Sequence, residues 1–356
     1  MTTADDDARV PDVSREPRRH HDPLSVRTVF VAPRRADRPT DVGATDASSP
    51  VDCPFCAGNE ALTPPDVLRM PADPGQPWHA RLIPNRFPVV EEFADGPLGA
   101  AADAPTRLAH GVHDVVIESR NHARSILEVD PDAWRDVWEL CRRRIAMFAD
   151  RGTLAWATVF KNSGPAAGAS LEHLHSQLVA LDFVPPTLAA ELAAAGQSAD
   201  PFGAALRQAE REDRIVATAA DLVALVPPAP RQPFEMLLLP RSAEPHFHAT
   251  SSERVAALAD LTRAVIGALD RLVPGADYNW WLHQAPFTAH APAAPPPANW
   301  HWHLEILPRL ANIAGFELGT GCHITTMSPA ESARRLRAAH FSSPAVTPGT
   351  GGPPRP

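Results

Sequence analysis

The chain has 356 residues, 44% of them hydrophobic, and a formal net charge of −9 at pH 7. This length allows two domains of ordinary size, and the acidic charge offers no basic surface for nucleic acid. No apolar stretch reaches the roughly 20 residues of a membrane span, and the polar stretch from Thr2 to Arg19 lacks the apolar core of a signal peptide. We therefore expect a cytoplasmic protein with no nucleic-acid or membrane partner.

Apolar residues recur at helical spacing over 131–150 and again over 252–272, which predicts two long amphipathic helices. Cys141 lies on the apolar face of the first of these helices and is expected to be a core residue. The segment 328–331 combines a capping box with proline at the first helical position. It predicts a last helix that runs to about Ala339 and packs on a sheet edge.

Four positions in the first half suggest a metal site. Cys53-Pro-Phe-Cys56 is a CxxC pair, His122 follows the apolar run 115–117, and His173 lies further along the chain. A CxxC pair alone could equally be a redox pair, and the four residues could be unrelated thiols and histidines. Taken together they form a Cys2His2 set, the usual closed tetrahedral zinc site. We therefore expect zinc at Cys53, Cys56, His122 and His173.

The segment His173-Leu-His175-Ser-Gln177, which follows Gly168-Ala-Ser170, indicates chemistry on phosphorus. In an extended strand the two histidines and the glutamine lie on one face. One histidine can then hold the metal while His175 attacks a phosphorus, and the neutral Gln177 amide can donate to an oxyanion. For attack, His175 must be neutral with its other ring nitrogen donating to a fixed acceptor, and we expect a backbone carbonyl there. This arrangement predicts nucleotidyl transfer through a nucleotidyl-histidine.

One unit of sequence occurs twice along the chain. The matching segments are 173–179 with 301–307, 114–120 with 235–241, and 82–88 with 225–230. Chance similarity between short apolar strings is the alternative, but three matches in the same order favour duplication. Each half is then predicted to contain a strand, a second strand, a helix and a third strand, in that order.

Three stretches carry a resemblance to a known family: Phe160 to Gln177, Cys53 to Glu60, and Asp22 to Pro39. They resemble the galactose-1-phosphate uridylyltransferases, a branch of the histidine-triad superfamily. The resemblance extends from about Arg19 to about Arg337, nearly the whole chain. It is specific for the transferase branch and less specific for one sugar nucleotide.

The resemblance and the internal repeat together imply an α+β fold of two tandem histidine-triad-like units, each an antiparallel sheet with packed helices. We expect a catalytic unit at 17–185 and a second unit at 186–340. The tails at 1–16 and 341–356 are expected to be disordered, because their composition cannot bury enough apolar surface. In this family active sites are completed across a dimer, so a homodimer is expected.

The resemblance also assigns roles in substrate binding. It implies that Gln177 binds the nonbridging oxygens of the nucleotidyl group, where relatives that hydrolyse carry a histidine. Further matches are Arg35 and Arg38 for the phosphates of the sugar substrate, Asn85 near the nucleoside, Asn162 and Ser170 for the nucleotide phosphate, and Glu317 for hexose hydroxyls. The alternative for the two arginines alone is ordinary surface charge.

A second metal site is implied by a match to an iron or zinc site of the better-known enzymes. Its residues are Glu191, His283, His301 and His303. Three histidines and one carboxylate suit either metal, and we expect a structural role. The match of Glu191 rests on spacing alone, and a solvated glutamate in an alanine-rich helix is the alternative.

Three positions depart from the better-known members of the family. Leu174 stands where they have proline, Ser176 where they have glycine, and Ala311 where they have lysine. The first two departures resemble a sub-branch that also contains ADP-glucose phosphorylases. The third leaves the hexose contacts open.

The leading hypothesis is therefore a transferase of galactose metabolism that exchanges UMP between UDP-glucose and galactose-1-phosphate by a ping-pong reaction. The close alternative uses the same histidine with inorganic phosphate as the second nucleophile, giving an ADP-glucose phosphorylase. A non-catalytic nucleotide-binding module is a third hypothesis, since the second repeat has Glu305 in place of the glutamine. The intact set of Asn162, Ser170, His175 and Gln177 disfavours that module.

Overall fold

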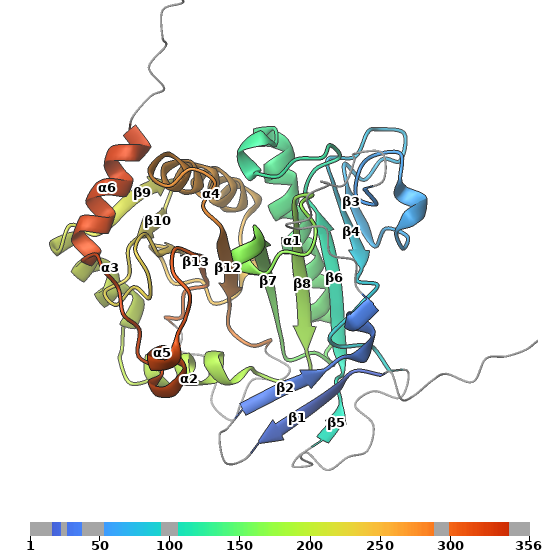
Figure 1. Ribbon diagram of the computed structural model, residues 1–356, viewed down its shortest axis with the longest axis horizontal. Coiled ribbons are helices and arrows are strands. Elements are labelled where there is room, and N and C mark those ends of the chain that lie inside the picture. Colours follow the sequence, from blue (N-terminus) through green and yellow to red (C-terminus); the bar gives the residue numbers. More distant parts are fainter. Residues whose placement is uncertain (1–15, 23–26, 38–52, 94–105, 288–298, 342–356) are drawn as a thin grey trace, which may run out of the picture.

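The computed structural model describes residues 16–22, 27–37, 53–93, 106–287 and 299–341 (Figure 1). The tails predicted to be disordered, apart from Glu16 and Phe341, lie outside these ranges, as does Arg38. Within the described ranges, none of the helices combines the length and the apolar content that crossing a bilayer requires.

A ten-stranded sheet extends through both halves of the chain in the order β3-β4-β6-β8-β7-β12-β13-β11-β10-β9, with antiparallel neighbours throughout. Its strands are β3 (Leu68–Met70), β4 (Ala80–Pro84), β6 (Gly111–Ile117), β7 (Trp156–Ser163), β8 (His175–Leu181), β9 (Ile215–Ala219), β10 (Leu222–Leu225), β11 (Met236–Pro240), β12 (Tyr278–His283) and β13 (His303–Pro308). A small antiparallel sheet of order β2-β1-β5 lies below it in Figure 1 and consists of β1 (Arg18–Asp22), β2 (Arg27–Val31) and β5 (Thr106–Leu108).

The strand order is symmetric about the β7–β12 pair. Reading outward from that pair, β8, β6, β4 and β3 on one side correspond to β13, β11, β10 and β9 on the other. The three sequence matches of the internal repeat fall on β8 and β13, β6 and β11, and β4 and β10. The predicted fold of two histidine-triad-like units is therefore confirmed, and the two sheets join edge to edge. The unit boundaries at 17–185 and 186–340 stay a prediction.

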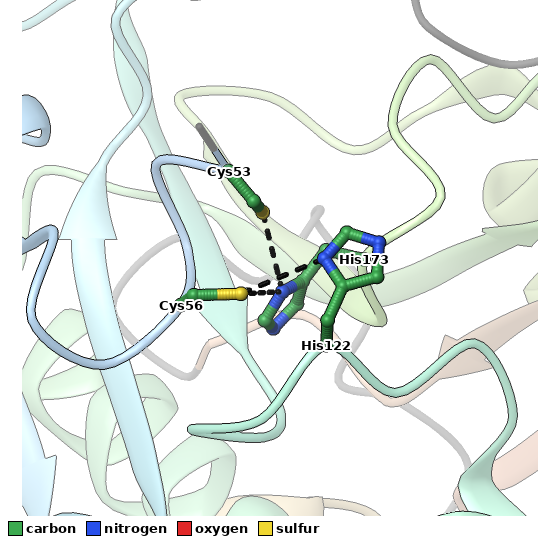
Figure 2. Close-up of side chains that lie close together, drawn as sticks. All are labelled: Cys53, Cys56, His122 and His173. Carbon is green, nitrogen blue, oxygen red and sulfur yellow. Dashed lines mark hydrogen bonds between the residues drawn. The ribbon is translucent and has the colours of Figure 1, made fainter. Parts of the chain in front are cut away.

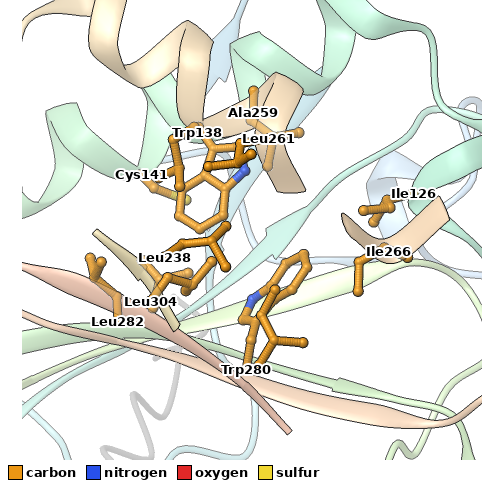
Figure 3. Close-up of a cluster of buried hydrophobic side chains, with 14 of the residues drawn as sticks. Ile126, Trp138, Cys141, Leu238, Ala259, Leu261, Ile266, Trp280, Leu282 and Leu304 are labelled. Atoms are coloured by element: carbon orange, nitrogen blue, oxygen red, sulfur yellow. The ribbon is translucent and has the colours of Figure 1, made fainter. Parts of the chain in front are cut away.

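Two long helices, α1 (Pro131–Asp150) and α4 (Ser252–Leu272), pack on one face of the sheet and on each other, with the predicted bounds. Helix α1 begins where it does because the Asp130 side chain accepts hydrogen bonds from two backbone N–H groups of the first turn, and Pro131 follows it. Trp138, Cys141 and Trp280 lie in the core between the helices and the sheet (Figure 3). The predicted burial of Cys141 is confirmed.

Helix α6 (Pro329–Phe341) packs against α4 and the edge strand β9, as the sequence predicts. The opposite face of the sheet carries α2 (Pro186–Ala195) and α3 (Pro201–Arg211), whose apolar residues Leu188 and Leu206 pack on β8 and β10 respectively. The remaining elements are α5 (Gly315–Thr320) and the short 3-10 turns Pro33–Asp37, Glu60–Leu62, Ile126–Glu128, Pro165–Ala167 and Phe247–Ala249.

Side chains along β6 and β8 point alternately to the two faces of the sheet, one of which is the core and the other the predicted site. Every residue of both strands is buried. Val116 and Leu178 point to the core under α1, so their neighbours in sequence point to the other face. Val115 lies opposite Gln177, and Ile117 lies opposite His175, in the ladder between the two strands. This second face carries the residues of the predicted site.

The buried ion pair between Arg144 of α1 and Asp114 of β6 gives a test of this packing. The Nε–Oδ2 distance is 2.8 Å, and the side chains are 5% and 1% exposed. Arg144→Met leaves a buried carboxylate without its partner, and we expect it to lower the free energy of unfolding by roughly 3–5 kcal/mol. Arg144→Met combined with Asp114→Leu should recover most of that loss. Urea denaturation measures both, and equal losses in the single and double variants would contradict the expectation.

Candidate active site

His175 stands at the start of β8 and is 8% exposed. Its Nδ1 lies 2.8 Å from the backbone carbonyl oxygen of His173. Because a carbonyl oxygen only accepts, Nδ1 carries the hydrogen, and the lone pair of the neutral ring is at Nε2. The predicted backbone carbonyl acceptor is confirmed. This is the tautomer that a nucleophilic histidine requires.

A buried charged cluster supports His175 from the core side of the sheet. The ladder between β7 and β8 ends at Phe160 and Gln177, two residues after His175 in the chain. The Nζ of Lys161 donates to the carbonyl oxygen of His175 at 2.9 Å. Lys161 also donates to Glu118, whose carboxylate accepts a hydrogen bond from the Ser176 hydroxyl as well. Burial lowers the pKa of Lys161, whereas the Glu118 carboxylate opposes that shift.

Two cavities meet at His175. The first has a volume of about 330 Å³ and an apolar lining that includes Phe55, Leu62 and Phe87, together with the polar side chains of Asn85, Ser170 and Gln177. The second is also about 330 Å³ and is lined by Arg124, Asn162, Ser163, the turn at Gly164, and Glu172. His175 lines both. A phosphorus bound to its ring therefore has room for one substituent on each side.

Residues of the second half hold the loop that separates these cavities. Gly164 has φ of 84°, and a Cβ there would come within 1.7 Å of Asp277 Oδ1. The other carboxylate oxygen of Asp277 accepts from the backbone N–H of Ala166 at 2.6 Å. Asn279 of β12 donates through Nδ2 to Asn162 Oδ1 at 2.9 Å. The β7–β12 junction between the two halves thus positions Asn162 and the loop that leads to Ser170.

The predicted Cys2His2 set comes together in the structure. The Sγ atoms of Cys53 and Cys56 and one ring nitrogen each of His122 and His173 lie within 4.8 Å of one another, and the four side chains point toward a common centre (Figure 2). His173 Nε2 lies 2.9 Å from the carbonyl oxygen of Ser119. That nitrogen therefore carries the hydrogen, and the Nδ1 lone pair faces the thiols, as in a metal-binding histidine.

The ionisable groups of this set respond to burial. Burial lowers the pKa of His173 to about 4, which keeps its ring neutral. Burial, followed by the neighbouring Cys53, raises the pKa of Cys56 to about 12, so the Cys56 thiol holds its proton without a cation beside it. A soft divalent cation would displace that proton. The donors therefore fit a thiolate-binding metal.

A second group of potential metal ligands consists of Glu191, His283, His303 and Glu305. Glu191 lies 2.9 Å from His283 Nδ1 and 2.9 Å from His303 Nε2. Although burial alone would raise the pKa of Glu191, its hydrogen bonds to the two histidines hold that pKa well below its usual range. Three of the four predicted residues meet here, which removes the alternative of a solvated glutamate.

His301 is the departure from the predicted second set, and Glu305 takes its place. His301 is not among the residues whose ligand atoms meet at Glu191, and its Nδ1 lies 2.7 Å from the carbonyl oxygen of Pro240, so that nitrogen carries the hydrogen. The ring stacks on Phe202 instead, with centroids 5.1 Å apart. In the first half the ring of His173 has the reverse orientation: its Nε2 lies on a carbonyl oxygen, and its Nδ1 faces the cluster. Sequence spacing alone does not distinguish these two ring orientations.

The structure brings most of the predicted substrate-binding residues to the cavities. Asn85, Ser170 and Gln177 line the first cavity, and Asn162 lines the second. Arg35 donates to the carbonyl oxygen of Phe87, which lines the first cavity, at 2.9 Å. Glu317 lies in α5, accepts from the backbone N–H of Ala314 at 3.1 Å, and is not among the described residues that line either cavity.

Five residues that the site uses were not predicted from the sequence: His113, Glu118, Arg124, Lys161 and Asp277. Glu118 and Lys161 each stand next to apolar residues in the sequence, and a lone charge in an apolar strand is a signal for a buried partner. Asp277 follows a glycine turn and looks like an ordinary loop residue. His113 lies next to Asp114 in a strand without any motif around it. Only the register of the sheet brings it to the site.

Comparison with known proteins agrees with this geometry. A family model described as a domain of unknown function (DUF4921) matches residues 91–342. ADP-glucose phosphorylase of Arabidopsis thaliana is 30% identical over 331 residues, which cover 91% of this chain and 93% of that protein. Galactose-1-phosphate uridylyltransferase of Haemophilus influenzae is 26% identical over 351 residues, 90% of this chain and 94% of that protein. The crystal structure of an Arabidopsis thaliana ADP-glucose phosphorylase with bound ADP-glucose has a TM-score of 0.72 and 31% identity over 90% of this chain and 98% of its own.

The fold and the His-x-His-x-Gln strand together define a nucleotidyltransferase of the histidine-triad type. The chain belongs to the galactose-1-phosphate uridylyltransferase family, as the sequence resemblance predicts, and residues 91–342 place it in the DUF4921 family as well. The relatives differ in the nucleotide sugar and the acceptor that their names give. Membership therefore fixes the class of enzyme and leaves the substrate to be argued from the site.

Proposed function

We propose that the protein is a sugar-nucleotide phosphorylase that acts on ADP-glucose through a covalent adenylyl intermediate on His175. The observation that carries this proposal is the neutral tautomer of His175 at the junction of two cavities. The apolar first cavity takes the nucleoside, and the second cavity, which carries Arg124 and Asn162, takes the departing sugar phosphate and then the acceptor. The 30% identity to an ADP-glucose phosphorylase supports the choice of nucleotide.

The reaction proceeds in two displacements at one phosphorus. The Nε2 lone pair of His175 bonds to the α-phosphorus, the bond from that phosphorus to the bridging oxygen breaks, and glucose-1-phosphate leaves with that oxygen. An oxygen of inorganic phosphate then attacks the same phosphorus, the P–N bond breaks, and ADP leaves while the phosphate proton passes to solvent. The His173 carbonyl keeps its hydrogen bond to Nδ1 and stabilises the positive ring of the intermediate.

Four further residues of the cavities have a task in this scheme. The Gln177 amide binds the nonbridging oxygens, where charge builds up in both transition states. Asn162 and Ser170, on either side of the Gly164 turn, bind the same phosphate group. Arg124, which is ion-paired with Glu172 at 2.8 Å, supplies positive charge to the second cavity for the leaving and attacking phosphates.

UMP exchange between UDP-glucose and galactose-1-phosphate is the second candidate, supported by the 26% identity to the Haemophilus influenzae enzyme. It requires recognition of a hexose on the acceptor. Glu317, the residue predicted for that contact, is not among the described residues lining either cavity, and Ala311 replaces the family lysine. Within one chain these observations favour the smaller acceptor, inorganic phosphate. A homodimer, which we also propose, is the arrangement in which Glu317 could reach a site.

The adduct on His175 is the test of the proposal. Incubation with ADP-glucose should raise the intact mass by one AMP, and inorganic phosphate should remove it with release of ADP. His175→Gly should form no adduct and keep its thermal stability within a few degrees, because the residue lies at a strand end. His79→Asn, a change at a half-exposed histidine paired with Asp136, serves as the control and should behave as the native chain. An adduct with UDP-glucose alone, discharged by galactose-1-phosphate, would support the second candidate, and no adduct with either would defeat both.

We further propose that Cys53, Cys56, His122 and His173 hold one zinc ion and that Glu191, His283, His303 and Glu305 hold a second metal, zinc or iron. Both are structural, since a bound metal fixes strands and loops that are far apart in sequence. The donor sets fit these metals, with thiolates in the first and imidazoles with carboxylates in the second.

Metal analysis of single variants tests these assignments. Cys53→Ser should lose one equivalent of zinc and lower the melting temperature by at least 5 °C, because part of the folding free energy comes from that metal. Glu191→Gln should lose the other equivalent and leave the first in place. Cys322→Ser, a change at an exposed thiol, is the matched control and should alter neither. A Cys53–Cys56 disulfide in the purified protein, or full stability of a metal-free sample, would rule out the zinc assignment.

Gln177 is expected to favour transfer over hydrolysis. An amide cannot act as a base toward water, whereas a histidine at the same place can. Gln177→His should therefore raise the rate at which water discharges the adenylyl-enzyme relative to phosphate, by about tenfold or more. The measurement is the partitioning of isolated adenylyl-enzyme between AMP and ADP at fixed phosphate. An unchanged ratio in a folded variant would mean that Gln177 only binds the phosphate.

A further inference from the structure

His113 lies beside Gln177 on the site face of the sheet, although it is absent from every motif of the sequence. It belongs to β6, is 4% exposed, and has its Nε2 3.0 Å from the Oε1 atom of Gln177. The ladder between β6 and β8 makes the two residues diagonal neighbours, since His113 pairs with Val179 and Gln177 pairs with Val115. The contact is therefore set by the sheet register.

A backbone hydrogen bond fixes which ring nitrogen of His113 carries the hydrogen. The N–H of Val89 donates to His113 Nδ1 at 3.1 Å. A backbone N–H only donates, so Nδ1 presents its lone pair, and the hydrogen of the neutral ring is on Nε2. That hydrogen points to Gln177, whose side chain can accept it only through its oxygen. The amide nitrogen of Gln177 is then left on the side that faces the cavity.

The same ring also lies against Asn85. The backbone N–H of Asn85 donates to the carbonyl oxygen of His113 at 2.8 Å, and the Oδ1 of Asn85 accepts from the N–H of Phe87 at 2.8 Å. Asn85 Nδ2 lies 3.0 Å from His113 Nε2. Since two N–H donors do not bond to each other, the amide hydrogens of Asn85 need an acceptor other than this nitrogen. Both amides thus present donors at the first cavity.

We propose that His113 is a positioning residue that fixes the orientation of the Gln177 amide, so that its NH2 group and not its oxygen meets the nonbridging oxygens of the transferred phosphate. The two orientations of a glutamine amide have nearly the same shape, and a neighbour must choose between them. With the oxygen toward the phosphate, two partial negative charges would face each other where the transition state needs a donor. This inference rests on the proposed function.

The test compares two replacements of His113. His113→Phe keeps a ring and removes the donor, whereas His113→Gln keeps an N–H near the position of Nε2. We expect His113→Phe to lower the single-turnover rate of adenylylation at saturating ADP-glucose by roughly 10- to 100-fold. This is less than the roughly 100- to 1,000-fold for removing one transition-state donor outright, because the amide stays in place. The affinity for ADP-glucose should change less than threefold, and His113→Gln should restore most of the rate.

A double-mutant cycle separates positioning from a general structural role. In a Gln177→Leu background the amide is gone, so adding His113→Phe should change the rate no further. If His113→Phe slows adenylylation by the same factor with or without Gln177, His113 does not act through the amide and the inference falls. A native chain that forms no adduct defeats the proposed function instead, so the two failures are distinguishable.

A measurement on the native protein covers the case in which His113→Phe does not fold. The nitrogen chemical shifts of ¹⁵N-labelled histidine, assigned to His113 by comparison with His113→Gln, report which ring nitrogen is protonated. A neutral ring with hydrogen on Nε2 supports the proposal. A ring with hydrogen on Nδ1 would reverse the orientation of Gln177 and overturn it.

Discussion

The hydrogen bond from His175 Nδ1 to the carbonyl oxygen of His173 links the two chemical parts of the site. The side chain of His173 belongs to the Cys2His2 cluster, and its backbone carbonyl sets the tautomer of His175, the proposed nucleophile, two residues later. Whatever fixes the cluster therefore also fixes the ring of the proposed nucleophile. Lys161 donates a hydrogen bond to the carbonyl oxygen of His175 itself from the core side of the sheet. His175 is in this way held both through its ring and through its own carbonyl group.

The second half contains the same hydrogen bond between two histidines, but there the second histidine belongs to a group of potential metal ligands. His303 Nδ1 lies 3.0 Å from the carbonyl oxygen of His301, just as His175 is bonded to His173. Its Nε2, however, lies 2.9 Å from the Glu191 carboxylate, so an acidic side chain occupies the space in front of this nitrogen, where a phosphate would have to approach. Glu305 stands where the first half has Gln177, and it is paired with Arg231. The two halves therefore share the strand and the histidine tautomer. They differ in the charged side chains around the histidine: Nε2 of His303 lies on a carboxylate, whereas His175 lines two cavities.

The buried Glu118–Lys161 pair explains one of the departures from the better-known family members. A glycine at position 176 has no side chain, whereas Ser176 donates a hydrogen bond to Glu118 beneath the catalytic strand. Taking both charges out of water is costly, and such pairs persist when further hydrogen bonds complete them. Here the carboxylate binds an ammonium and a hydroxyl, and the ammonium binds a carbonyl. The charged cluster thus couples three strands directly below the nucleophile.

The sequence by itself determined the elements whose signals are local. Helices α1 and α4 have the predicted bounds because caps and the apolar period of a helix are written in neighbouring residues. The CxxC pair and the His-x-His-x-Gln segment were also visible, since each depends on a fixed short spacing, and the repeat was visible from three short matches in the same order. Tertiary structure alone decided the contacts that depend on register and ring orientation. His113 reaches Gln177 because two strands pair in one register, and Glu305 takes the place of His301 in the second cluster because the His301 ring stacks on Phe202 instead. No short-range pattern encodes either fact, because the partners are brought together only when the sheet forms.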